Sequence, residues 1–439
     1  MAPASDAFTQ LLRSLPTLED FRPETIRGAA GFFRVGQTLG GEWWLIDAAD
    51  RAFFSCAVNA VRFGPRPPEG VAEGQFLGEP TDVSDAMAET FGRLRRWNVN
   101  TLGPGSEPAL IGHGLMSTEI MDFGRIAPST TIRLGGAFVP DVFDPKWVEA
   151  CQRRAEEVCS QRRDSAALIG YFTDDGLNWS QFPEDAAGRV QRPTLLQICL
   201  SLEPGFPAYH AAWEFTLAAH GGELAAMARA WGADLPNKEA LRQLTLADSA
   251  LMSAGYRRDH DRFSREFARR YFAACAAAIR HHDPHHLILG GRLAVAAPAL
   301  LAECVSPQVD VLSVSQRDAG LFERIDAAAV EGMPVMVGDF CWANDAFAKN
   351  PAAGEPRGLT SVERMLARGR AAWERALTHP ALVGCAWARW QDAPEDRPPF
   401  GRGLVHVDGG EAREHSELLS GLYARAETIR RGENPLSLP

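Results

Sequence analysis

The sequence lacks an excess of basic residues. Its 439 residues include 45 Lys and Arg against 56 Asp and Glu, which gives a formal net charge of −11 at pH 7. Proteins that bind nucleic acids present a basic face to the phosphates, so we expect no nucleic-acid partner. The charge balance suits a protein that handles neutral or cationic small molecules, although solubility alone would also explain it.

Long apolar runs and paired cysteine motifs are also missing. No stretch of about 18 apolar residues occurs, so we expect no membrane partner. The first residues, Met-Ala-Pro-Ala-Ser-Asp-Ala-Phe, have neither the basic start nor the apolar centre of a signal peptide. The eight cysteines are scattered without a CxxC pair or a Cys/His cluster, which predicts free, buried thiols rather than zinc ligands or disulfides. These absences predict a cytoplasmic protein.

Short apolar runs alternate with helical patterns along most of the chain. Strands are expected at 53–59, 99–102, within 109–122, from 167, and at 286–292, 309–315, 334–340 and 382–390. Helices are expected from 82 and at 144–163, 259–279, 297–304, 321–330, 360–378 and 413–431. Strands that are apolar throughout predict a parallel sheet covered on both faces. Eight of them predict an α/β fold, a (β/α)8 TIM barrel. A doubly wound sheet would need a glycine-rich phosphate turn after the first strand, which Asn59-Ala-Val-Arg-Phe-Gly lacks.

Two segments are predicted outside the regular barrel of residues 51–439. Residues 1–50 form an N-terminal segment with a short helix at 7–15 and a hairpin whose turn is Asp47-Ala-Ala-Asp50. Residues 176–255 follow the fourth strand and carry only weak helical patterns, at 222–231 and 238–246. So long an excursion from the carboxyl end of a strand predicts a helical, lid-like insertion or a substrate wall, with plain decoration as the alternative.

Polar residues appear abruptly where the fourth strand ends, in Tyr171-Phe-Thr-Asp-Asp-Gly-Leu-Asn-Trp. In barrels of this type, catalytic residues lie at the carboxyl ends of the strands. This segment resembles the Tyr-Phe-Thr-Asp-Asn-Glu-Leu-x-Trp segment of agarase-like clan-A glycoside hydrolases. Further similarity at 43–59, 94–103, 283–292 and 334–340 extends the resemblance from Trp43 to about Val405. It implies a TIM barrel that acts on a glycoside.

The resemblance also locates the family's two catalytic glutamates, and both positions differ here. The acid/base position is Gly176, which cannot transfer a proton, and the nucleophile position is Asp339 in Pro334-Val-Met-Val-Gly-Asp-Phe. The carboxylate of an aspartate falls short by about 1.5 Å, one C–C bond, and a 1 Å misplacement can cost on the order of 10²-fold. The predicted catalytic residues are therefore Asp339 with Asp175 or Asp174.

Three hypotheses follow from these departures. The first is a rebuilt aspartate pair, which could lie at the wider separation of an inverting enzyme with a water between its members. The second is a substrate that needs no acid, because its leaving group is good or because it supplies the proton itself. The third is a barrel that has lost glycosidase chemistry and either binds sugars or runs another reaction on a polyol-like ligand.

Other side chains near the predicted strand ends are candidate ligand contacts. Arg292 ends the fifth strand and could clamp a hydroxyl or carboxylate, or pair with Asp339 instead. Asp174 and Asp175 could simply cap their turn. Tryptophans stack on sugar rings but also fill the cores of large barrels, and we favour Trp387 for the site. The asparagines could bind ligand hydroxyls or only local backbone. The full set of candidate substrate-binding residues is Asn59, Asn100, Arg292, Trp342, Trp387, Trp390 and Gln391.

Neither a metal site nor a cofactor motif is predicted. His281, His282, His285 and His286 lie where a helix runs into a strand, the stability end of a barrel, so surface or capping roles are expected for them. A divalent cation held by Asp175, Asp339 and an imidazole has no supporting spacing. The expected ligand is a small molecule or an oligosaccharide.

Overall fold

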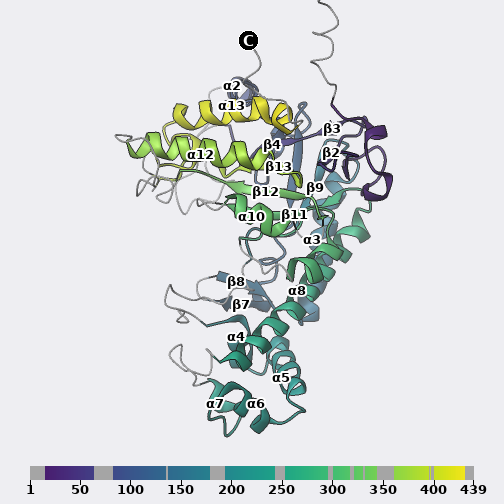
Figure 1. Cartoon of the computed structure of the whole chain (residues 1–439), viewed down its shortest axis with the longest axis vertical. Coiled ribbons are helices and arrows are strands. Elements are labelled where there is room, and N and C mark those ends of the chain that lie inside the picture. The colour runs from purple at the N-terminus through teal and green to yellow at the C-terminus, as the bar shows by residue number, and fades with distance from the viewer. Residues whose placement is uncertain are drawn as a thin grey trace, which may run out of the picture.

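The computed structural model describes residues 15–63, 83–134, 137–177, 193–242, 253–294, 300–316, 321–329, 332–343, 360–394, 396 and 400–430. Within these residues, eight strands pair in parallel in the order β10-β9-β6-β5-β4-β13-β12-β11 (Figure 1). They are β4 (Ser55–Val58), β5 (Thr101–Leu102), β6 (Met116–Ile120), β9 (Leu168–Phe172), β10 (Leu287–Ile288), β11 (Leu312–Gln316), β12 (Val335–Phe340) and β13 (Leu382–Trp387).

The two ends of this sheet meet just beyond β10. Leu293 forms a parallel bridge with Val314 of β11. The Leu293 N–H donates to the Ser313 carbonyl at 2.9 Å, and the Ser315 N–H donates to the Leu293 carbonyl at 3.0 Å. The strands therefore follow one another in sequence order around a curled sheet, which confirms the predicted TIM-barrel fold.

Helices fill most of the predicted positions between the strands. They are α2 (Val83–Arg96), α3 (Pro145–Arg162), α8 (Ala254–His282), α10 (Leu321–Ala328), α12 (Ser361–Leu377) and α13 (Arg413–Arg430), with a π-helical turn at Leu301–Val305. Local sequence sets their starts: Thr360 and Glu363 form a capping box at α12. α8 begins five residues earlier than the predicted Asp259, because the Ser253 hydroxyl accepts the Tyr256 N–H and caps the helix there.

The N-terminal segment packs against the barrel as an antiparallel sheet. Its strands are β1 (Arg34–Gln37), β2 (Trp43–Ile46) and β3 (Ala52–Phe53). The predicted hairpin turn is present, and the Asp47 carboxylate accepts the backbone N–H groups of Ala49 and Arg51. β1 was not predicted, because glycines interrupt its pattern. Most of the predicted helix at 7–15 lies outside the described residues.

Residues that follow β9 form the helices of the insertion. These are α4 (Leu195–Ser201), α5 (Pro207–Ala219), α6 (Leu224–Trp231) and α7 (Glu239–Arg242). Figure 1 shows them around the outer end of α8, near the hairpin of β7 (Thr131–Leu134) and β8 (Ala137–Pro140). The 29 residues of α8 span about 43 Å, far more than a barrel strand. Because α8 returns to the amino end of β10, its first half carries the insertion beyond the carboxyl ends of the strands.

Most of the buried side chains are apolar, although the barrel strands also bury polar ones such as Ser55, Thr101 and Ser313. All eight cysteines are buried and none is paired with another, as predicted. Among the described residues, no helix has both the length and the apolar character needed to cross a membrane.

Candidate active site

Three of the predicted site residues meet at the carboxyl ends of the strands. Asp339 lies in β12, Asp175 follows β9, and Arg292 follows β10. The guanidinium of Arg292 places Nε 3.5 Å from Asp175 Oδ1 and Nη2 3.8 Å from Asp339 Oδ2. Because both nitrogens belong to one planar group, the two carboxylates lie within roughly 10 Å of each other.

The two carboxylates differ in their access to solvent. The side chain of Asp339 is 1% exposed, whereas that of Asp175 is 45% exposed. Both contacts with Arg292 are ion pairs too long to be good hydrogen bonds. Within the described chain, the buried Nε of Arg292 has no hydrogen-bond partner. The guanidinium is thus held by charge while Nε remains available as a donor to a ligand.

A bulge in β12 aims Asp339 into the barrel. Pairing with β11 passes from Val337 directly to Asp339, which leaves Gly338 out of the register. The Gly338 carbonyl instead accepts Asn59 Nδ2 at 3.0 Å. Glycine is needed here because a Cβ atom would lie 2.8 Å from Cγ of Arg292. Asn59 therefore belongs to the mouth, where it fixes the strand that carries Asp339.

Arg292 itself has a strained backbone. Its φ is +46°, a left-handed conformation that costs a side-chain-bearing residue about 1–2 kcal/mol. Ser313 Oγ accepts the Arg292 N–H at 2.8 Å, and Ser315 Oγ donates to the Arg292 carbonyl at 3.0 Å. No motif in the sequence singles out these two serines, although their alternation in β11 places both on one face. Such strain is typical of functional positions.

Asp174 has a different environment from its neighbour Asp175. Its buried carboxylate accepts the Gly124 N–H at 2.8 Å and the Tyr271 hydroxyl. Burial raises the pKa of Asp174 well above its usual value, and the nearby Asp122 adds to that rise. These contacts support the turn-holding role that was the alternative for Asp174.

Asn100 also makes local backbone contacts. Its Oδ1 accepts the Cys56 N–H at 2.8 Å, and its Nδ2 donates to the Phe54 carbonyl at 2.9 Å. Asn100 thereby fastens β4 to the start of β5. The geometry supports the backbone-binding alternative for this residue.

Trp342 and Trp387 pack against each other in the core. Their ring centroids lie 4.6 Å apart, and both side chains are fully buried. Trp387 donates to the Arg402 carbonyl at 2.8 Å, and Trp342 donates to His415 Nδ1 at 3.1 Å. Both indoles thus have their hydrogen bonds inside the protein, which supports the core-filling alternative for them.

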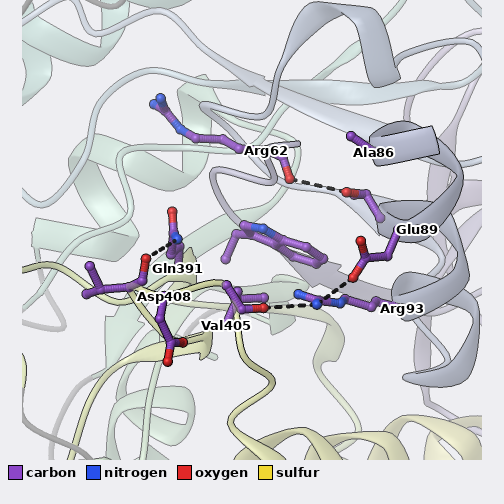
Figure 2. A pocket seen from close by; sticks show the side chains of 11 residues that line it. Arg62, Ala86, Glu89, Arg93, Gln391, Val405 and Asp408 are labelled. Atoms are coloured by element: carbon purple, nitrogen blue, oxygen red, sulfur yellow. Dashed lines mark hydrogen bonds and ion pairs between the residues drawn. The ribbon is translucent and has the colours of Figure 1, made fainter. Parts of the chain in front are cut away.

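Trp390 and Gln391 line a pocket beside the barrel mouth. This pocket of ≈ 300 Å³ lies between α2 and the chain that follows β13 (Figure 2). Its lining residues are Arg62, Ala86, Glu89, Thr90, Arg93, Trp390, Gln391, Val405, Val407, Asp408 and Gly409. Of the predicted binding residues, Asn59 and Arg292 therefore lie at the mouth, and Trp390 and Gln391 lie in this separate pocket.

The histidine-rich stretch lies at the amino end of the barrel. His286 donates to Asp283 Oδ2 through Nδ1 at 2.7 Å and contacts the Ser165 carbonyl through Nε2 at 2.9 Å. Tyr171 donates to the same carboxylate oxygen of Asp283 at 2.7 Å. Over the described residues, no group of three or more His, Cys, Asp and Glu side chains is placed to hold a metal ion.

Comparisons with known proteins agree with this architecture. No family model matches the sequence. Beta-agarase A of Vibrio sp. (strain JT0107) is 22% identical over 424 residues, covering 82% of this chain and 42% of that protein. The chain therefore spans less than half the length of this curated relative.

Solved structures give the fold more fully. An exo-beta-agarase superposes with a TM-score of 0.73 at 18% identity, over 97% of this chain and 70% of that one. Another agarase gives a TM-score of 0.69 at 16% identity, over 97% and 69%. At such identities the likeness establishes the fold alone. In sequence and in fold, the chain resembles the agarase-like clan-A glycoside hydrolases.

Proposed function

We propose that this chain is a glycosidase-like, carbohydrate-active protein whose reacting groups are Asp339 and Asp175. The observation that carries the proposal is the single guanidinium of Arg292, which contacts both carboxylates at the barrel mouth. Glycoside hydrolysis needs two carboxyl groups on opposite sides of the scissile bond. The agarases that share this fold support a sugar as the ligand.

The roles of the two aspartates follow from their exposure. Asp339 is buried and fixed by the β12 bulge, so it can direct its charge at the anomeric carbon or at a water beside it. Asp175 is half-exposed and can exchange protons with solvent. Arg292 can donate to a sugar hydroxyl while it balances the two negative charges.

One observation favours an alternative function. The Arg292 side chain occupies the space between the two carboxylates, where a scissile bond would have to lie. A barrel in this arrangement could bind a sugar without cleaving it, or act on a different polyol-like molecule. In that case Arg292 is the ligand's main partner.

We also propose that residues 176–255 act as a lid over the mouth. Support comes from α8, whose length carries α4 to α7 beyond the carboxyl ends of the strands. The eight buried, unpaired cysteines support a reducing compartment, and we place the protein in the cytoplasm.

The missing acid at Gly176 gives the test of this function. A nitrophenol leaves without protonation, whereas a sugar alkoxide needs help worth roughly 10²–10⁴-fold. We expect weak hydrolysis of nitrophenyl glycosides and little or none of agarose-type oligosaccharides. Azide should accelerate turnover if a glycosyl intermediate forms on Asp339.

Gly176→Glu sharpens this test. Among the described residues, a Cβ at position 176 would meet nothing closer than the Arg292 carbonyl oxygen at 3.9 Å, so the first atom of a new side chain fits there. The φ of +73° makes any side chain cost about 1–2 kcal/mol there. We expect improved cleavage of unactivated oligosaccharides despite this cost. Brisk cleavage of such substrates by the unmodified protein would show that Asp175 or Asp174 already works as the acid.

A further inference from the structure

The pocket between α2 and the chain after β13 has a polar wall on each side. Figure 2 shows Glu89 and Arg93 on the α2 side, with Gln391 and Asp408 facing them. Arg62 lies at one edge, and the small side chain of Ala86 leaves room near the start of the helix. The lining of this pocket does not include Asp339, Arg292 or Asp175.

Gln391 offers an acceptor with no partner in the described part of the chain. Its Nε2 donates to the carbonyls of His406 and Val407 at 3.1 and 3.4 Å. These bonds fix the amide, yet its buried Oε1 has no hydrogen-bond partner there, although Gln391 is only 9% exposed. A buried acceptor left in this state costs about 1–3 kcal/mol, which a donor from a ligand would recover.

Trp390 supplies a rigid apolar surface beside that acceptor. Its ring centroid lies 5.3 Å from that of Trp97, and Trp97 is itself fixed by a hydrogen bond of 2.8 Å to Glu411. Trp390 is only 4% exposed, and its backbone N–H donates to the Asn59 carbonyl at 2.8 Å. An indole held in this way suits the apolar face of a sugar ring.

The charges around the pocket are balanced. Arg93 donates to Glu89 at 2.6 Å and to the Gly409 carbonyl at 3.0 Å. Arg62 and Asp408 add one charge of each sign. A lining with as many acids as arginines favours a neutral ligand over an anion or a cation. Hydroxyl groups can use carboxylate, amide and guanidinium partners alike.

We infer that this pocket binds one neutral sugar residue, at a second site beside the barrel mouth. The ligand's apolar face rests on Trp390, and one of its hydroxyls donates to Gln391 Oε1. The inference goes beyond the proposed function, because the pocket binds whether or not Asp339 catalyses a reaction. Asn59 links the two places, since its carbonyl accepts Trp390 and its amide donates to Gly338 beside Asp339.

The test uses a pair of matched variants on one helix. Ala86 lines the pocket, whereas Ala88 is exposed on the same helix and does not. Ala86→Phe should fill the pocket without removing any hydrogen bond, and Ala88→Phe adds the same ring elsewhere. Binding of methyl β-D-galactoside to the full chain is measured by calorimetry or ligand-observed NMR, with D-galacturonate and D-galactosamine as charged controls. Circular dichroism verifies that both variants fold.

We expect millimolar binding of the neutral sugar by the wild type. Ala86→Phe should weaken it by about tenfold or more, while Ala88→Phe leaves it within about twofold. Asp339→Asn should still bind at this pocket. Equal binding by Ala86→Phe and wild type, tighter binding of either charged sugar, or no binding at about 10 mM would each overturn the inference. Loss of sugar binding in Asp339→Asn, with binding retained in Ala86→Phe, would also overturn the inference. That result would place the sugar at the mouth and would be compatible with the proposed function.

Discussion

The two ends of the barrel each bury an aspartate, in opposite surroundings. At the amino end, Asp283 accepts from Tyr171, from the His286 ring and from the backbone N–H groups of His285 and His286. At the carboxyl end, Asp339 lies 3.8 Å from Arg292, a residue whose own backbone is strained. Hydrogen bonds from a tyrosine, a histidine ring and two backbone N–H groups surround Asp283. Asp339 instead faces a guanidinium whose position depends on a backbone with positive φ.

This difference suits the amino end to stability and the carboxyl end to the proposed function. Burial raises the pKa of Asp283, but hydrogen bonds from His286 and Tyr171 outweigh it and lower that pKa to about 2. Folding therefore favours the ionised carboxylate there. At the mouth, three features together set the position of Asp339: the bulge in β12, the positive φ of Arg292, and the missing side chain of Gly338, which leaves room for Arg292. The amino end of a TIM barrel is in general its stability end, and the carboxyl end its functional one.

Asp283→Ala should have the largest effect on stability. It leaves the His286 ring and the Tyr171 hydroxyl buried without their shared partner, and each buried polar group left unsatisfied costs about 1–3 kcal/mol. Urea denaturation followed by circular dichroism measures the free energy of unfolding. The folded fraction should keep its ligand binding. A loss below about 1 kcal/mol would mean that the two ends do not differ as described.

His260 on α8 should make the free energy of unfolding depend on pH between about 6.5 and about 4. Burial, with a smaller contribution from Arg257, lowers the pKa of this histidine from 6.5 to about 4. As pH falls from about 6.5 to about 4, the unfolded chain binds a proton that the folded chain excludes, so stability falls by about 3 kcal/mol. Denaturation at several pH values should show this slope, and His260→Gln should flatten it. An unchanged slope in the variant would assign the dependence to other groups, though not to Asp283, which titrates lower.

Gly338→Ala should have a smaller effect, confined to the mouth. The new Cβ would lie 2.8 Å from Arg292 Cγ, and only the flexible side chain of Arg292 can move away. We expect roughly a tenfold loss of activity or ligand affinity, with a stability change of about 1 kcal/mol. Gly92→Ala in α2 is the matched control, because a Cβ there meets nothing closer than Arg96 Nη1 at 3.7 Å. Gly92→Ala should stabilise the protein slightly. An equal loss of function in both variants would mean that the close contact with Arg292 Cγ does not cause the loss.

Much of the fold was predictable because buried parallel strands leave continuous apolar runs. The grouping of Asp339, Arg292 and Asp175 followed from the same logic, since strand ends converge in a barrel. Side-chain direction was less predictable: the packing of Trp342 against Trp387 depends on neighbours distant in the chain. α4 and α5 were missed, and in α5 apolar residues on most sides hide the helical period.

The pocket lined by Trp390 and Gln391 was also invisible to sequence reasoning. It exists only because α2 packs beside a segment some 300 residues later, as the Arg93 contact with Gly409 shows. The sequence predicts that Trp390 and Gln391 lie near the last strand, but it does not predict that they face α2 across a pocket.

The most direct test of the central claim is the rate of nitrophenyl-glycoside hydrolysis by Asp339→Asn relative to the wild type, at equal folded fraction. Asparagine keeps the shape of the side chain but removes the charge that Arg292 faces. We expect measurable turnover by the wild type and a loss of about a thousandfold or more in the variant, with a melting temperature that barely changes. Hydrolysis retained by Asp339→Asn, or a large loss of stability with binding intact, would show that Asp339 is a structural partner of Arg292 and not a reacting group.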